Sequence, residues 1–109
     1  MRELTKIEEI LLLAIWKLKD DAYGVKIRQH VSKVIEKDFT YGNLYSALNQ
    51  LERKEYVMKR FGELTPVRGG RKKVFYSVNE IGLEALKASY KMNEAMWEGI
   101  TEYALNNNK

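Results

Sequence analysis

The stretch that decides the fold is Arg68-Gly69-Gly70-Arg71-Lys72-Lys73-Val74-Phe75-Tyr76-Ser77-Val78. Two glycines favour a turn, four cations crowd within six residues, and a β-prone run follows at once. This order predicts a short β-hairpin with a basic tip, whose first strand is expected over residues 56–62. A tip of this charge suits a phosphate backbone, so the hairpin is a candidate nucleic-acid-binding wing.

Apolar residues recur at helical spacing before the hairpin and predict three helices, over residues 5–18, 23–37 and 41–54. Thr5-x-x-Glu8 fits a capping box at the first start, and Thr40 fits an N-cap at the third. Asp20-Asp21 offers an N-cap for the second helix. After the hairpin, a long helix is expected from Glu80 to about Asn106, capped by Asn79.

The predicted order is helix, helix, helix, strand, wing, strand, long helix. The fold class is therefore mainly α with a small β-hairpin (α+β), in a winged helix-turn-helix arrangement. We expect a DNA-binding domain over residues 1–78 and a C-terminal dimerisation helix over residues 79–109. In this arrangement the third helix enters a major groove and the wing meets neighbouring phosphates.

The predicted third helix has two unlike faces. Leu44, Leu48 and Leu51 lie at i, i+4 and i+7 and are expected to face the core. The opposite face carries amide and hydroxyl groups with almost no acids, whereas a merely solvated face usually carries Glu and Lys. Because amides can donate and accept at base edges, Asn43, Ser46 and Asn49 are the base-reading candidates.

Further DNA contacts are expected around this helix. Tyr45 is expected to pack its ring inward and place its hydroxyl at a phosphate, and Tyr23 is expected to contact a phosphate at the start of the second helix. The remaining candidates are cations or turn residues: Lys26, Thr40, Tyr41, Arg53, Arg68, Gly70, Arg71, Lys72 and Lys73.

The net charge of +4 is unevenly distributed. Residues 1–78 hold 16 Lys/Arg and 10 Asp/Glu, and residues 53–73 hold 8 cations and 2 acids. Residues 79–109 hold only 3 Lys/Arg against 5 Asp/Glu, so the last helix needs another purpose. Its apolar residues alternate in steps of four and three, which is typical of a coiled-coil seam, and we expect a homodimer.

The expected dimer interface draws on the first and last helices. In one interpretation these residues only pack against a second chain; in the other, Trp16, Met92, Met96 and Trp97 line a pocket for a small aromatic effector. Both interpretations stay open. The interface candidates are Leu12, Trp16, Leu86, Tyr90, Met92, Asn93, Met96, Trp97 and Ile100.

Three motifs in order resemble the PadR-like family of winged-helix transcriptional regulators, over roughly residues 4–90. The resemblance rests on Asp21-Ala22-Tyr23-Gly24-Val25-Lys26-Ile27, on Gly42-Asn43-Leu44-Tyr45-Ser46-Ala47-Leu48-Asn49-Gln50-Leu51-Glu52-Arg53-Lys54, and on Gly69-Gly70-Arg71-Lys72-Lys73-Val74-Phe75-Tyr76-Ser77-Val78-Asn79-Glu80-Ile81-Gly82. The resemblance implies a homodimeric repressor on a near-palindromic operator, dimerised mainly through the last helix. It also implies, for the short branch, a flat pocket beside a tryptophan of that helix, here Trp97.

Other functions have less support in the sequence. The chain has no Cys and one His, so no thiolate site, paired metal ligands or catalytic triad is expected, and neither a cofactor nor enzyme activity is predicted. The acid pairs Glu8-Glu9 and Asp20-Asp21 fit capping and solvation. No apolar run approaches the roughly 18 residues of a membrane span, and a cytoplasmic protein is expected. The alternative function is a winged-helix protein–protein module that does not bind DNA.

Overall fold

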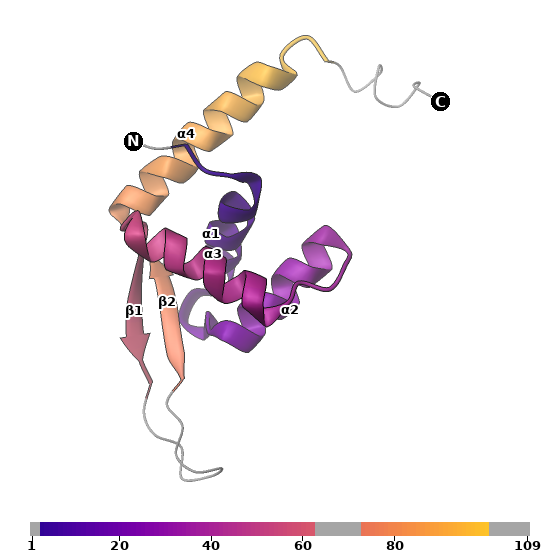
Figure 1. Ribbon diagram of the computed structural model, residues 1–109. Helices are drawn as coiled ribbons and strands as arrows, with labels where there is room; N and C mark the ends of the chain where they lie inside the picture. The colour runs from indigo at the N-terminus through magenta and orange to yellow at the C-terminus, as the bar shows by residue number, and fades with distance from the viewer. Residues whose placement is uncertain (1–2, 63–72, 101–109) are drawn as a thin grey trace.

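The computed structural model describes residues 3–62 and 73–100, and within them five-residue strands and longer helices follow the predicted order (Figure 1). A single 3-10 turn, Lys19–Asp21, separates the first two helices. The elements are α1 (Lys6–Leu18), α2 (Gly24–Ile35), α3 (Tyr41–Arg53), β1 (Val57–Phe61), β2 (Val74–Val78) and α4 (Glu80–Trp97).

Three of the predicted helix starts are confirmed, and each is held by a side-chain cap. The Glu8 backbone N–H donates to Thr5 Oγ1 at 3.1 Å, and the Thr5 N–H donates to Glu8 Oε1 at 2.9 Å, which completes the capping box. Thr40 Oγ1 accepts from the Asn43 N–H at 3.1 Å, and Asn79 Oδ1 accepts from the Gly82 N–H at 2.8 Å. These local bonds fix where α1, α3 and α4 begin.

The start of α2 was predicted wrongly. Asp20 and Asp21 lie in the 3-10 turn, and the N-cap position is Tyr23, whose side chain makes no cap bond. The chain instead joins the hairpin here: Tyr23 pairs with Phe75 in an isolated antiparallel bridge, and the Tyr76 N–H donates to the Ala22 carbonyl at 2.8 Å. Pairing with β2 therefore places the start of α2, and the sequence gave no local sign of it.

The hairpin pairs antiparallel with Val57 opposite Val78, Lys59 opposite Tyr76 and Phe61 opposite Val74. Figure 1 shows it projecting from the helices at the end away from α4. Residues 63–72, which include the predicted wing tip, lie outside the described residues.

The core gathers side chains from every helix and both strands. Leu11, Ile27, Leu44 and Leu48 are among its fully buried members. Leu12 also has 0% exposure, which corrects its predicted place at a dimer interface: it packs inside its own chain and offers no surface to a partner.

The last helix joins this core at its beginning and leaves it towards its end. Ala85 and Leu86 are buried, and Gly82 lies directly against the Tyr56 carbonyl, where a Cβ would not fit. The helix ends at Trp97, not near Asn106 as predicted, and Ile100 lies outside it. The predicted division at residue 79 stays a prediction, although the first turns of α4 pack with the body.

One buried ion pair joins distant parts of the core. The Lys54 Nζ atom lies 2.8 Å from both carboxylate oxygens of Glu8, and the Glu8 residue is only 5% exposed. The solvated role predicted for Glu8 is therefore wrong, although its capping role is right. Burial raises the pKa of the Glu8 carboxyl, but hydrogen bonds from Lys54 and Thr5, together with the Lys54 charge, outweigh it and leave the pKa below its ordinary value.

In the two stretches that the structure describes, no helix has both the length and the apolar character that crossing a membrane requires.

We predict that Glu8→Gln lowers the free energy of unfolding by about 3 kcal/mol, because it leaves the Lys54 ammonium buried beside a neutral amide. The folded-state pKa of Glu8 is depressed, so its stabilisation is fully present above the unfolded pKa of about 4.3 and is lost as pH falls through the folded value. Urea unfolding at about pH 7 and about pH 3.5 measures both effects.

The matched control is Glu52→Gln, which breaks the more exposed pair between Glu52 and Lys59. We expect this control to cost less than about 1 kcal/mol. A wild-type protein and a Glu8→Gln variant with the same dependence of stability on pH would contradict the assignment.

Candidate nucleic-acid interface

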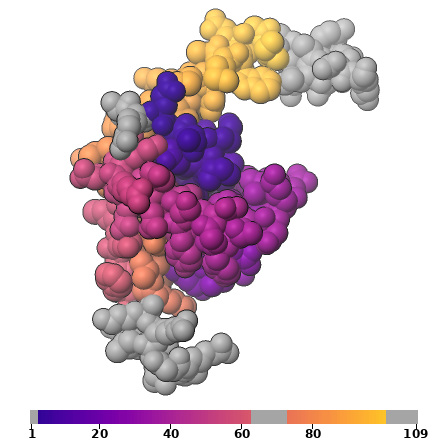
Figure 2. Space-filling model, viewed as in Figure 1, coloured from indigo at the N-terminus to yellow at the C-terminus, as the bar shows by residue number. Residues whose placement is uncertain are grey.

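The helix α3 presents one face to the core and the opposite face to solvent. Leu44, Leu48 and Leu51 are fully buried, which fixes the rotation of the helix about its axis. The residues half a turn away are all exposed, and Figure 2 shows α3 open on the surface of the molecule. We call this set the outer stripe: Gly42, Ser46, Asn49 and Arg53.

The outer stripe carries no carboxylate. The acid that α3 does contain, Glu52, lies to one side and pairs with Lys59 of β1 at 3.0 Å. This ion pair turns the carboxylate towards the hairpin and partly cancels its charge. A surface of small polar groups and one guanidinium therefore remains on the exposed face of α3, as a helix that enters a major groove requires.

Asn43, which was predicted to read bases beside Ser46 and Asn49, lies off the centre of the stripe. With Ser46 it lines an open hollow of about 600 Å³ between α3, the beginning of α1 and the end of α2. Asn49 lies away from this hollow, within the outer stripe. The structure thus brings Ser46 and Asn49 to one face and places Asn43 at its edge.

The tyrosines of α3 form a stacked pair on the flank of the helix. The Tyr41 and Tyr45 ring centroids lie 6.3 Å apart with an interplanar angle of 18°. Tyr45 is 46% exposed, so its ring does not pack inward as predicted; position 45 lies a quarter turn from the buried leucines. Its hydroxyl instead lies beside Gly24, only 2.5 Å from where a Cβ would stand, so glycine permits this approach to the start of α2.

A second aromatic group joins the start of α2 to the hairpin. The Tyr23 ring meets Phe75 edge to face, with centroids 5.5 Å apart. Lys73 Nζ lies 4.3 Å from the centroid of the Tyr23 ring, and the Arg60 guanidinium lies 4.4 Å from that of Phe75. The predicted phosphate contacts Tyr23 and Lys73 are therefore neighbours, at the N-terminal end of a helix where anions are favoured.

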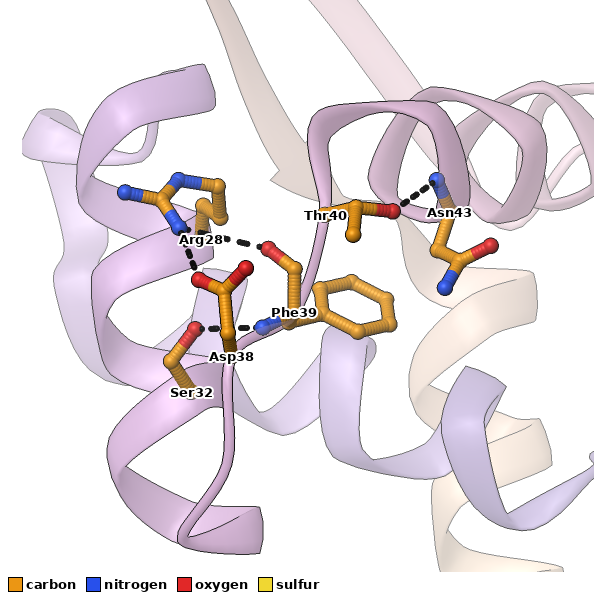
Figure 3. Close-up of polar contacts among 6 residues, drawn as sticks. All are labelled: Arg28, Ser32, Asp38, Phe39, Thr40 and Asn43. Atoms are coloured by element: carbon orange, nitrogen blue, oxygen red, sulfur yellow. Dashed lines mark hydrogen bonds and ion pairs between the residues drawn. The ribbon is translucent and has the colours of Figure 1, made fainter.

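The turn between α2 and α3 is organised by Arg28, a residue that the sequence analysis did not include among its DNA contacts (Figure 3). Arg28 Nη1 donates to Asp38 Oδ1 at 2.9 Å and to the Phe39 carbonyl at 3.3 Å. The Phe39 N–H in turn donates to Ser32 Oγ at 3.0 Å. The Arg28 guanidinium also lies 4.6 Å from the centroid of the Tyr41 ring. Nothing in the spacing of these residues predicted that they meet.

The other predicted contacts have less defined surroundings. Lys26 Nζ lies 3.9 Å from Asp21 Oδ2, in an exposed pair, and Thr40 is exposed at the start of α3. The basic residues of the wing tip cannot be placed beside them. Arg68, Gly70, Arg71 and Lys72 lie outside the described residues.

A separate apolar groove of about 920 Å³ runs between α1 and α4. Its walls include Leu13, which was not predicted, and the predicted Leu86, Tyr90 and Trp97. Asn93 Nδ2 donates to Glu9 Oε2 at 3.2 Å across the groove. The predicted residues Trp16, Met92 and Met96 are exposed but lie outside its lining.

Among residues 3–62 and 73–100, no three His, Cys, Asp or Glu side chains gather as a metal ion would require.

The fold and this surface define a winged helix-turn-helix protein. A family model for the Transcriptional regulator PadR-like family matches residues 12–88, and the chain belongs to that family. The predicted family and fold class are thereby confirmed, and membership supports a DNA-binding regulator. The family consists of transcription regulators and gives no support to an enzyme.

Solved structures with low sequence identity share the fold. RosR from H. salinarum is 19% identical with a TM-score of 0.68, and the match covers 93% of this chain and 84% of that one. A PadR family transcription regulator from Clostridium difficile R20291 is 22% identical with a TM-score of 0.64, covering 90% and 97%. A transcriptional regulator from Clostridium thermocellum is 20% identical with a TM-score of 0.68, covering 86% and 88%. A search of curated proteins gave no match.

Proposed function

We propose that this protein is a homodimeric repressor that binds a near-palindromic operator in double-stranded DNA. The outer stripe of α3 carries the proposal, because it is exposed, free of carboxylates and held rigidly by the buried leucines behind it. Ser46 and Asn49 read base edges, and Arg53 contacts a phosphate or a guanine. In a repressor that acts on the chromosome, this places the protein in the cytoplasm.

The residues around α3 supply the contacts that do not read sequence. The N-terminal end of α2 presents Tyr23 and Lys73, and Tyr45 holds its hydroxyl beside Gly24 at the same end. Backbone amides at a helix start favour a phosphate, and Tyr and Lys add donors. The cations of residues 68–72, which sit beyond β1 and β2 in the sequence, extend this contact to the neighbouring backbone.

We predict that Arg71→Ala with Lys72→Ala weakens binding to operator and random DNA alike and lowers the slope of log affinity against log salt by about 1.8, or 0.9 per phosphate lost. Asn49→Ala is the matched contrast: it should cost about 1–3 kcal/mol on the operator only and leave the salt slope unchanged. The measurement is a salt series of gel shifts with a duplex recovered from a random pool and with a random duplex.

An unchanged salt slope in the double wing variant would remove the phosphate assignment. Failure of the wild-type protein to bind random DNA below about 100 mM salt would favour the alternative function, a protein–protein module.

The dimer is proposed to form through α4 and the groove beside it. Trp97, Tyr90 and Leu13 are each more than a third exposed there although they are apolar, and a second α4 can cover them. Two recognition helices related by the two-fold axis would then reach successive major grooves, about 34 Å apart.

We predict that the wild-type protein sediments as a dimer at micromolar concentration and that Tyr90→Glu weakens the dimer at least about tenfold, because it would bury a charge in an apolar contact. Ala88→Glu is the control, since Ala88 is exposed on α4 but does not line the groove. A wild-type monomer, or an Ala88→Glu variant as impaired as Tyr90→Glu, would contradict this interface.

The same groove is a candidate site for a small aromatic effector that releases the repressor from DNA. Packing against the second chain is the alternative use of Trp97, and the two differ in a single measurement. We predict that a flat aromatic compound quenches tryptophan fluorescence in Trp16→Phe, which retains only Trp97, and does not do so in Trp97→Phe. Absence of quenching in both would leave packing as the function of Trp97.

A further inference from the structure

We infer that Arg28 is a positioning residue for DNA recognition: it orders the Tyr41–Tyr45 pair so that both hydroxyls are held in place before DNA arrives. The inference rests on the proposed DNA-binding function and adds a residue to it. It starts from a stack of three side chains, Arg28, Tyr41 and Tyr45, that crosses from α2 to α3.

The stack explains how two exposed rings keep a defined place. Tyr41 is 43% exposed and Tyr45 is 46% exposed, so neither is fixed by burial. Tyr41 instead lies between two partners, with the Arg28 guanidinium 4.6 Å from its centroid and the Tyr45 ring 6.3 Å away on a nearly parallel plane. Such contacts restrict side-chain rotation, which would otherwise be lost on binding at a cost in affinity.

Arg28 is itself fixed from the side opposite to solvent. Its Nη1 atom donates to both Asp38 and the Phe39 carbonyl, which belong to the turn that leads into α3 (Figure 3). Its Nε atom is buried and has no hydrogen-bond partner within the described residues. A guanidinium held in this way is a rigid platform for Tyr41, which a flexible ammonium cannot replace.

The pairing with Asp38 also argues against a direct phosphate contact. Asp38 lies 2.9 Å from the guanidinium and is itself exposed, so a phosphate approaching Arg28 would meet a carboxylate beside it. Arg28 therefore acts through Tyr41, and the other end of the stack reaches the start of α2, where the Tyr45 hydroxyl lies beside Gly24.

The test is a double-mutant cycle on DNA affinity with Arg28→Lys, Tyr41→Leu and the two combined. Arg28→Lys keeps the charge and removes the planar stack, and should weaken binding to the selected duplex roughly three- to tenfold. Tyr41→Leu removes the ring and should weaken binding at least as much. The double variant should be no weaker than Tyr41→Leu alone, because Arg28 has nothing left to position.

Two further readouts separate positioning from other roles. The salt slope of Arg28→Ala should equal that of the wild type, whereas loss of a direct phosphate contact would lower it by about 0.9. The Tyr45 ring resonances of the free protein should lose their dispersion in Arg28→Lys, which a mere change in stability would not cause. Lys33→Arg, an exchange on the exposed surface of α2, is the control and should bind as the wild type does.

Additive losses in the double variant, a reduced salt slope or wild-type affinity in Arg28→Lys would each overturn the inference. Should Arg28→Lys fail to fold, Arg28→Gln takes its place with the same expectations, since its planar amide can still donate to the Phe39 carbonyl. If the wild-type protein selects no duplex, the proposed function fails. If it selects one and Arg28 variants bind it normally, only the positioning role fails.

Discussion

The contact between Glu8 and Lys54 is the constraint on which the arrangement of the helices depends. A carboxylate with 5% exposure is costly to bury unless it is both paired and hydrogen-bonded, and Glu8 meets both conditions through Lys54 and the Thr5 N–H. The same side chain therefore begins α1 and holds the residue that follows α3. Any movement of the end of α3 away from the start of α1 would leave this charge without its partner.

The first turns of α1 also contact α4, on the side next to that ion pair. Glu9, the next residue, accepts a hydrogen bond from Asn93 at 3.2 Å, and it lines the groove where Tyr90 and Trp97 lie. Two consecutive carboxylates thus connect one short segment to the recognition helix on one side and to the proposed dimer helix on the other. Because α1 is buried along most of its length, the segment transmits position as a rigid body and not by bending.

The sequence was sufficient to predict features that arise from residues three or four apart. The capping box at Thr5, the caps at Thr40 and Asn79, and the rotation of α3 set by Leu44, Leu48 and Leu51 are all of this kind. The features it missed join distant residues: Glu8 with Lys54, Tyr23 with Phe75, and Arg28 with Tyr41. No periodicity records such meetings, since each depends on how whole elements pack.

Two errors have a more specific physical origin. Leu12 lies on an α1 that is apolar over most of its girth, and such a pattern does not say which apolar side meets the chain's own core. The structure uses that side for the core, so Leu13, at the next position, faces the groove. The seam predicted for α4 continued past Trp97 because its apolar spacing continues, but the chain leaves the helix at Glu98, and Gly99 has a φ of 87°.

The distribution of ion pairs shows where affinity for DNA must come from. Several cations near α3 are already paired with acids of this chain, namely Lys26 with Asp21, Arg28 with Asp38 and Lys59 with Glu52. Within the described residues, Arg53 and Lys73 make no ion pair, so they keep their full charge for an incoming phosphate. Two such cations per chain release few counterions, and most of the proposed electrostatic attraction therefore depends on the four-cation stretch of residues 68–73. The helix α3 can then be specialised for reading bases, because it does not also have to supply the affinity.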